Sequence, residues 1–290
     1  MKELNSVADL IREANRLQCG ISNIVINHQV ATLGVSETAL FEGMRSRYQI
    51  MRDAIRGGLQ TARSVSGLSG GQAKRYRQNA SKIGLLSGTA EHAMEAALAI
   101  SEYNAAMGLV VAAPTAGSCG ILPAVLFAVG QAYDLPEEHL IRALFNSAGI
   151  GAVIAARASL SGAEGGCQAE CGSAAAMAAS AVAELLGGTP EKCGDACALS
   201  LKFTMGLVCD PVAGLVEVPC VKRNAFGAVT ALTAAELALC GISSAIPADE
   251  VIDAMKAVGD QMVPALKETS RGGLAATKTA RGIEKRIKRI

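Results

Sequence analysis

Apolar residues recur at helical spacing along most of this chain. In the more polar N-terminal part the pattern predicts two helices, at residues 7–18 and 36–56, with Gly57-Gly58 as the stop signal of the second. Alternation of period two is almost absent, and only residues 214–219 could be extended. From about residue 89 the pattern predicts eight more helices, at residues 91–111, 121–133, 136–150, 151–160, 173–186, 192–205, 224–239 and 248–267. The sequence therefore predicts a mainly α fold.

The composition indicates how these helices pack. Half of the 290 residues are apolar, but aromatic residues make up only 3%, so alanine and glycine must supply most of the interior. We expect a single compact multi-helix domain with small-residue helix packing and Gly/Pro-rich site loops. Residues 1–85 would form a helical N-terminal segment of the same domain, and residues 86–290 its helical core. A Ser/Gly-rich stretch at residues 64–76 is either a lid over a site or a plain linker.

Charge and cysteine content exclude several classes of protein. With 27 basic and 26 acidic side chains, the chain has no electrostatic footprint for nucleic acid. The N-terminus lacks the apolar core of a signal peptide, so we expect a cytoplasmic protein whose nine cysteines stay reduced. Residues 103–133 carry no charge, but prolines and glycines interrupt them, so we expect no membrane span. Metal binding therefore explains the high cysteine count better than disulfides do.

Three cysteines lie in tight contexts that contain glycine or proline: Cys167 in EGGCQAEC, Cys209 in GLVCDPVAG and Cys220 in EVPCVKRNA. Three thiols presented from three loops suit a soft-ligand metal site with one coordination position left open. An iron–sulfur cluster held by three cysteines keeps one iron free to act as a Lewis acid. We take such a cluster as the leading hypothesis.

Spacing alone does not select these three ligands from nine cysteines. Two pairs of cysteines are four residues apart, a spacing that suits zinc as well as a cluster. The simpler interpretation of the other cysteines is that they belong to helices or to the core, and we expect this of Cys171, Cys193, Cys197 and Cys240.

Two further segments could bind a carboxylate. In APTAGSCG, residues 113–120, Thr115 and Ser118 lie in a turn before a predicted helix, where hydroxyls and amides can bind an anion. In ETSRGGLA, residues 268–275, Ser270 and Arg271 precede two glycines. A capped helix start and a glycine C-cap explain the two segments equally well. There is no HExxH motif and no GxGxxG after a strand, which disfavours a zinc hydrolase and a nucleotide-binding protein.

Four segments carry a resemblance to a known family: APTAGSCGILPAV, SGAEGGCQAECGSA, GLVCDPVAGLVEVPCVKRNA and ETSRGGLA. They resemble the α subunit of bacterial iron–sulfur-dependent L-serine dehydratase. The resemblance implies a lyase that converts L-serine to pyruvate and ammonia, with a 4Fe–4S cluster on Cys167, Cys209 and Cys220. It also implies that Thr115 and Ser118 hold the substrate carboxylate, and that residues 86–290 are the catalytic core.

The resemblance has two departures. Single-chain relatives carry an additional domain, and some end in a cysteine that can reach the cluster, whereas the last cysteine here is Cys240. We therefore expect a β subunit as partner and an enzyme that is incomplete without it. His28, Lys202 and Lys222 are candidates for the base that removes the α-proton, although the partner is the better source. Three alternatives stay open: a cluster-dependent cysteine desulfidase, a pyridoxal-phosphate β-eliminase and a zinc-binding structural subunit.

Overall fold

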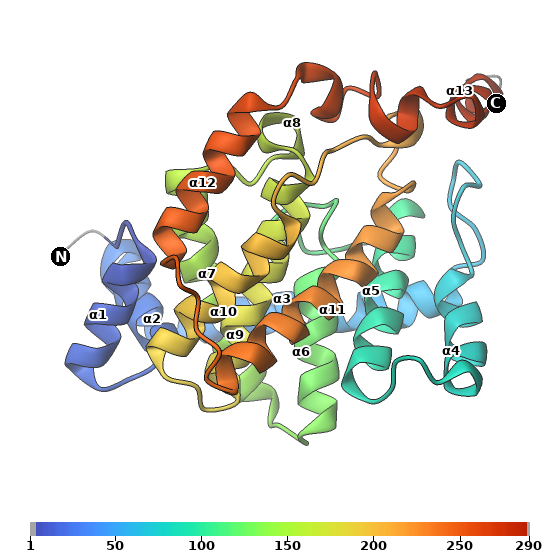
Figure 1. Cartoon of the computed structure of the whole chain (residues 1–290). Helices are drawn as coiled ribbons and strands as arrows, with labels where there is room; N and C mark the ends of the chain where they lie inside the picture. Colours follow the sequence, from blue (N-terminus) through green and yellow to red (C-terminus); the bar gives the residue numbers. More distant parts are fainter. Residues whose placement is uncertain (1–3, 289–290) are drawn as a thin grey trace.

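The computed structural model describes residues 4–288, and over this range it confirms the mainly α fold (Figure 1). Within these residues, the extended backbone pairing is limited to one isolated β-bridge, between Cys209 and Lys267. The α-helices are α1 (Val7–Leu17), α2 (Ile21–Leu33), α3 (Glu37–Gln60), α4 (Gln72–Ile83), α5 (Thr89–Ala105), α6 (Ile121–Ala132), α7 (Glu137–Arg157), α8 (Gly162–Gly165), α9 (Ser173–Leu185), α10 (Pro190–Thr204), α11 (Cys220–Leu239), α12 (Ala248–Gln261) and α13 (Lys278–Ile287). A π-helical turn, η1 (Gln168–Gly172), and three 3₁₀ turns, η2 (Val212–Gly214), η3 (Pro264–Leu266) and η4 (Gly273–Ala276), complete the elements.

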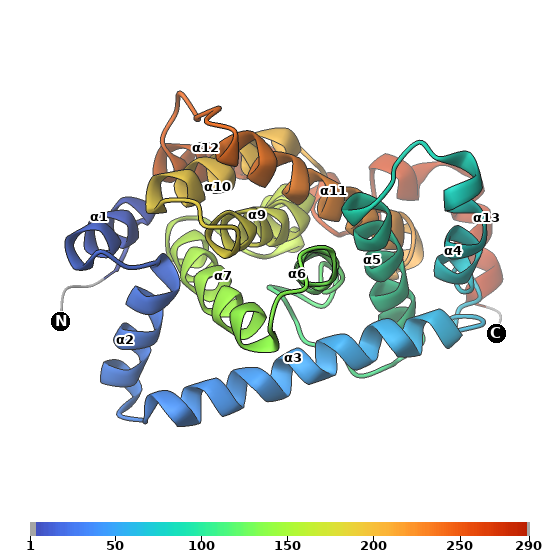
Figure 2. The ribbon, with the colours of Figure 1, turned by 90° about the horizontal axis from the view of Figure 1, so that it is seen from below.

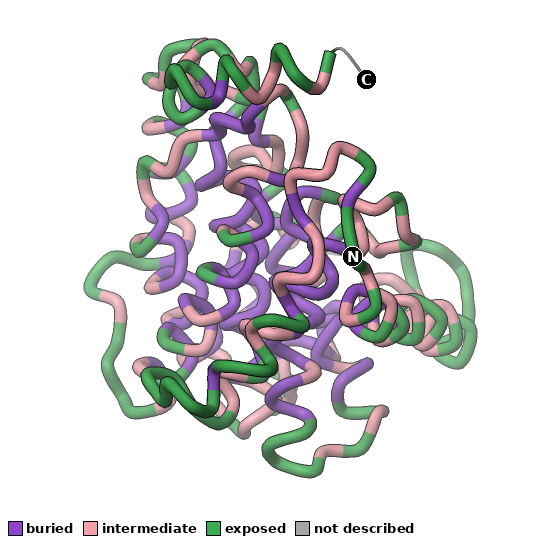
Figure 3. Tube along the Cα trace, turned by 90° about the vertical axis from the view of Figure 1, so that its right-hand side faces the viewer, coloured by how far each residue is buried: buried purple, intermediate pink, exposed green. Residues whose placement is uncertain are grey.

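The centre of the bundle is α9. Helices α6, α7, α10 and α11 contact it, and together they enclose it (Figure 2). All its residues from Ser173 to Ala183 are buried, and most of them are alanine. Alanine on every face of a helix allows its neighbours to approach closely, and such a helix is stable only inside a protein. Figure 3 shows this buried centre with exposed residues around it.

The N-terminal helices share this core. Buried residues from α1 to α12 form one hydrophobic cluster, which includes Val7, Ile24 and Ile55 as well as Ile252. Helix α2 packs against α7, and the long helix α3 runs beneath the bundle and contacts α5 (Figure 2). Helices α1 to α4 therefore pack on the same core as the helices that follow.

The predicted stop at Gly57-Gly58 is wrong, because α3 continues to Gln60. A Cβ on Gly58 would lie 1.8 Å from the carbonyl oxygen of Ala99 in α5. Gly58 therefore allows two helix backbones to touch. The prediction of two separate helices at 136–150 and 151–160 is also wrong, because this part of the chain forms one helix, α7. There a Cβ on Gly149 would meet Val25 of α2 at 2.4 Å.

Other predicted boundaries also differ from the structure. Helices α2 and α4 were not predicted, and the helices expected at 91–111 and 248–267 end at Ala105 and Gln261. Helix α11 begins at Cys220, four residues before the predicted start. Residues 214–219, which could have been extended, fold instead as the end of a 3₁₀ turn and a tight turn.

The Ser/Gly-rich stretch connects α3 to α4 and is held by two buried carboxylates. Glu217 accepts hydrogen bonds from the hydroxyls of Ser66 and Ser69, each at 2.5 Å. Glu102 accepts from the amides of Gln72 and Ala73 at the start of α4, at 2.9–3.0 Å. The loop is therefore fixed to the helical core.

Helix α7 is long and apolar enough to cross a bilayer, judged by length and composition alone. However, 67% of its most apolar window is buried inside the protein, as expected for a core helix. The uncharged stretch at 103–133 is interrupted as predicted, because α5 ends at Ala105 and α6 begins only at Ile121.

Candidate active site

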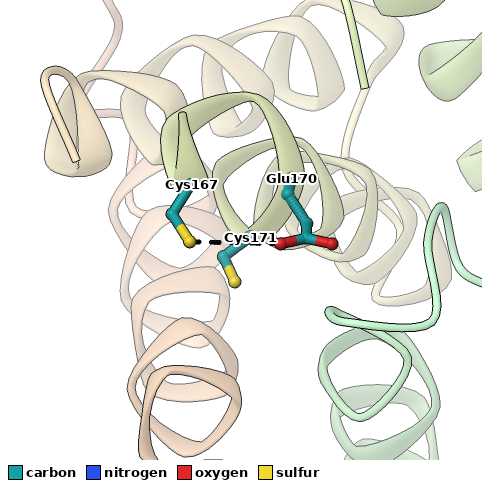
Figure 4. A group of neighbouring side chains, drawn as sticks. All are labelled: Cys167, Glu170 and Cys171. Atoms are coloured by element: carbon teal, nitrogen blue, oxygen red, sulfur yellow. Dashed lines mark hydrogen bonds between the residues drawn. The ribbon is translucent and has the colours of Figure 1, made fainter. Parts of the chain in front are cut away.

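A π-helical turn between α8 and α9 brings three ligand-type side chains together. Gly166 adopts a φ of 77°, which glycine tolerates readily, and the chain then enters η1. The thiols of Cys167 and Cys171 and the Glu170 carboxylate project from this turn toward one another (Figure 4). One ligand atom from each lies within 4.8 Å of the other two. Single π-helical turns inside helices are frequent at functional sites.

Gln168 fixes this turn. Its side-chain amide donates to the carbonyls of Gly165 and Met255, at 3.0 and 2.9 Å, and its Oε1 accepts from the amide of Gly206 at 2.9 Å. The side chain is fully buried, so these bonds also satisfy its polar atoms. The position of Cys167 is therefore set by α12 and by the loop after α10 as well as by its own turn.

The other two predicted ligands come from segments that pack on this turn. Cys209 pairs with the segment after α12: its amide donates to the carbonyl of Leu266 at 2.9 Å, and its carbonyl accepts from Glu268 at 2.7 Å. Cys220 is not in a loop, as the sequence suggested, but is the first residue of α11. Burial raises the pKa of its thiol to about 12, and the charges of Cys167 and Glu170 add to the shift. Cys209 and Cys220 thus lie near Cys167, but neither belongs to the tight group of Cys167, Glu170 and Cys171.

Cys171 is a fourth thiol at the same place. The sequence predicted a helix or core cysteine, and Cys171 is indeed buried in η1, but its side chain hydrogen-bonds to Cys167. Hydrogen bonds from Cys171 and Cys209 lower the pKa of the Cys167 thiol to about 3, with help from the Arg223 guanidinium. The same bonds, together with burial, raise the pKa values of Cys171 and Cys209. Cys167 is therefore the thiolate of the group.

The cation beside this thiolate is Arg223, which sequence reasoning missed. Its Nη1 lies 3.4 Å from Cys167 Sγ and donates to the carbonyl of Val208 at 2.9 Å. Its Nη2 pairs with Asp210 at 2.8 Å, and the two side chains are only 14% and 4% exposed. The sequence did contain a signal for Arg223: it is a cation three residues after the predicted ligand Cys220, in the segment CVKR. Asp210 also accepts from the amide of Leu274 at 2.7 Å, which ties the C-terminal segment to the site.

Glu170 was also missed, although it stands inside the GCQAEC motif. Burial raises the pKa of its carboxyl to about 7, and a hydrogen bond from Thr115 only partly offsets this. Thr115 Oγ1 donates to Glu170 Oε1 at 2.5 Å and accepts from the amide of Ser118 at 3.2 Å. Because a Cβ on Gly117 would lie 2.4 Å from Glu170 Oε1, the APTAGSCG turn passes directly against this carboxylate.

A cavity of about 520 Å³ opens beside the thiols. Thr115, Gly117, Gly162 and Glu170 line it, together with Val216, Glu268 and the segment from Ala158 to Ser161. Of the four predicted substrate-binding residues, Thr115 lies in this lining, and Ser118 is fully buried behind it with its Oγ 3.0 Å from Thr115 Oγ1. The Ser/Gly-rich loop contributes nothing to this lining.

The structure places the other predicted site residues apart from this lining. Ser270 donates its hydroxyl to the carbonyl of Pro211 at 2.7 Å, and Arg271 is exposed. His28 lies in a separate surface pocket between α1 and α2, and Lys202 donates to Ser244 at 2.6 Å. Lys222 lines a third pocket between α4, α5 and α11, and burial lowers its pKa.

The donor set fits an iron–sulfur cluster. Thiolates are the ligands that such clusters prefer, and four buried thiols from three segments lie in this region. Arg223 is placed to hold the negative charge of Cys167, as charged groups around metal ligands commonly do. The thiols themselves do not line the cavity, but Glu170, which belongs to the same group, does.

Comparison with known proteins identifies the family of this chain. The family model described as serine dehydratase alpha chain matches residues 16–275. The probable L-serine dehydratase alpha chain of Bacillus subtilis is 48% identical over 283 residues, which cover 97% of this chain and 94% of that protein. The L-serine dehydratase alpha chain of Peptoniphilus asaccharolyticus is 40% identical over 284 residues, 97% of each chain.

A longer relative shows how the chain relates to larger proteins. The L-serine dehydratase TdcG of Escherichia coli is 37% identical over 281 residues, which cover 94% of this chain but only 62% of that protein. The match to the family model spans the whole site, from Thr115 to Glu268. The chain therefore belongs to the serine dehydratase alpha chain family.

Proposed function

We propose that this chain is the catalytic subunit of an L-serine dehydratase, a lyase that converts L-serine to pyruvate and ammonia. The observation that carries the proposal is the group of Cys167, Cys171 and Glu170, whose carboxylate lines a cavity that has the volume for a small amino acid. Relatives named L-serine dehydratase at 37–48% identity support the substrate and the reaction.

Cys167, Cys209 and Cys220 would hold a 4Fe–4S cluster, with the fourth iron left without a protein ligand. When bound, such a cluster supplies a Lewis acid that makes the serine hydroxyl a better leaving group. Arg223 holds the Cys167 thiolate in place, and its pair with Asp210 fixes the guanidinium. The residues that present the ligands are thus arranged before substrate enters, which is the basis of electrostatic preorganisation.

The rest of the chain's contribution is to bind the substrate. Thr115 lies in the wall of the cavity, and Ser118 lies behind it with its Oγ 3.0 Å from Thr115 Oγ1. Thr115, supported by Ser118, and the neighbouring amides would hold the substrate carboxylate. Removal of the α-proton and departure of the hydroxyl group give aminoacrylate, which tautomerises to an imine. Water then hydrolyses the imine to pyruvate and ammonia, so the chain need only carry out the elimination.

We propose that the base that removes the α-proton comes from a second, β subunit. None of the three candidate bases in this chain lines the cavity: they are His28, Lys202 and Lys222. Names that specify an alpha chain among the relatives support a two-chain enzyme. We place this heterodimer in the cytoplasm, because nine free cysteines suit a reducing compartment.

The test is anaerobic reconstitution with iron and sulfide, followed by a pyruvate assay with and without the β subunit. We expect iron, acid-labile sulfide and a broad visible absorbance to appear together, and pyruvate to form from L-serine only with both chains. Zinc in place of iron and sulfide would contradict the cluster. Full turnover by this chain alone would contradict the two-chain enzyme.

A further inference from the structure

The charged residues that line the candidate cavity are all acidic. They are Glu164, Glu170 and Glu268, and they come from three separate segments. The chain as a whole is nearly neutral, with 27 basic and 26 acidic side chains, so this is a local property of the cavity. A cavity lined by one sign of charge attracts ligand groups of the opposite sign.

Two of these carboxylates face the same point beside the thiols. A Cβ built on Gly162 would lie 3.4 Å from Glu170 Oε2, 3.4 Å from Glu268 Oε2 and 2.9 Å from Cys209 Sγ. Gly162 itself occupies the wall of the cavity. Because Gly162 has no side chain, the two carboxylate oxygens and the Cys209 sulfur face one another across a small space.

The Glu170 carboxylate and the backbone of Glu268, an exposed residue, are held in position by their surroundings. Thr115 donates to Glu170 at 2.5 Å. Glu268 has a left-handed backbone, with a φ of 61°, and its amide donates to the carbonyl of Cys209 at 2.7 Å. A side chain is strained in this conformation, and such strain is characteristic of functional positions. The neighbouring cation, Arg223, is already engaged by Asp210 and Cys167.

From this arrangement we infer that Glu170 and Glu268 form an ammonium subsite, which binds the α-amino group of the substrate next to the thiol ligands. The inference deepens the proposed function and rests on it. A primary ammonium has three N–H donors, so two carboxylates can accept from it at once. The subsite selects amino acids over hydroxy acids of the same size, because a ligand without the ammonium would leave two facing carboxylates unpaired.

Glu268→Gln in the reconstituted two-chain enzyme tests this subsite, because Gln keeps the shape of the side chain and removes its charge. We expect the KM for L-serine to rise about 10- to 100-fold, as loss of one charge-assisted hydrogen bond does, with kcat changed less than about threefold. The Kd of L-alanine, which has the ammonium but no leaving group, should rise by the same factor. The Kd of 3-hydroxypropanoate, which lacks the ammonium and is repelled by the carboxylates, should not rise and should fall if it changes.

Glu138→Gln is the matched control. Glu138 is an exposed carboxylate in the first turn of α7 and does not line the cavity. We expect its KM and both Kd values to equal those of the unchanged enzyme. A merely structural role of Glu268 would weaken both ligands alike, and that result would overturn the subsite.

Unchanged L-alanine binding in Glu268→Gln would also overturn it. Calorimetric titration of the two ligands decides the matter without turnover. If the unchanged enzyme makes no pyruvate from L-serine, the proposed function fails. The comparison of L-alanine with 3-hydroxypropanoate then still shows whether the cavity discriminates by the ammonium.

Discussion

Two regions of this protein contain buried cysteines, and their environments differ. Near the cavity, Cys167 lies beside Cys171 and Cys209 and 3.4 Å from Arg223 Nη1, and its pKa is lowered to about 3. In the middle of the bundle, Cys193 and Cys197 of α10 are as deeply buried, at 1% and 0% exposure. There burial raises both pKa values, that of Cys197 to about 12.

Burial alone therefore does not produce a metal-binding thiol. The thiols of α10 behave as small apolar side chains between alanine-rich helices. Those at the cavity are different because separate segments bring them together and because a cation stabilises one of them as the thiolate, which is the form that binds metal. The following four substitutions test this distinction, beginning with the largest expected effect.

Cys209→Ala should remove the cofactor and the activity together. The variant should contain no acid-labile sulfide after anaerobic reconstitution and should form no pyruvate, because three thiolates are needed to hold the cluster. Cys193→Ala is its counterpart in the bundle and should keep both. Iron and sulfide analysis measures the difference, and equal losses in the two variants would end the distinction between the regions.

Arg223→Met should destabilise the cavity region strongly. It leaves the Asp210 carboxylate buried without its cation, and breaking a buried pair in this way costs about 3–5 kcal/mol. Arg157→Met is the control, because Arg157 pairs with Asp253 at an exposed site where such pairs contribute less than about 1 kcal/mol. Urea unfolding of the cluster-free chain measures both. Similar losses would show that Arg223 is an ordinary surface cation.

Gly58→Ala tests the close packing of the bundle. The new methyl group would overlap the Ala99 carbonyl of α5, so α3 must move away, at a cost of about 1–3 kcal/mol. Gly43→Ala, in the same helix, meets only the end of the Arg47 side chain and should be neutral or stabilise by up to about 1 kcal/mol. Thermal unfolding distinguishes the two, and a neutral Gly58→Ala would contradict the close approach.

Cys171→Ala should have the smallest effect. If Cys167, Cys209 and Cys220 are the ligands, removal of the fourth thiol leaves the iron content unchanged and costs about 1 kcal/mol for the small cavity created. Iron analysis and urea unfolding measure the two quantities. Loss of iron in this variant would make Cys171 a ligand and would change the proposed ligand set.

Helices α9 and α10 could be predicted well from the sequence. Helix α9 was predicted at 173–186 and α10 at 192–205, within one or two residues of their observed bounds. The polar helix α4 could not be predicted, because its start is stabilised from a distance by Glu102 of α5. No pattern within residues 72–83 records that contact, so propensity alone left the segment as a loop.

The site was predicted in part. Thr115 could be named because its motif stands in a turn before a helix, and the structure places it on the cavity wall. Glu170 and Glu268 could not be selected among 26 acidic residues, because nothing local distinguishes them. They matter only as a pair that faces Gly162, and that pairing depends on how α8 packs beside the C-terminal segment.

The sequence by itself determined that this protein is helical, packed through small residues and rich in cysteine, because periodicity and composition act locally. Tertiary structure alone decided which thiol becomes the thiolate, which cation accompanies it and which carboxylates meet beside it. These properties depend on distances between side chains far apart in the chain. Electrostatic interaction in a buried site depends on those distances and on exclusion of water, and neither is encoded in any single segment.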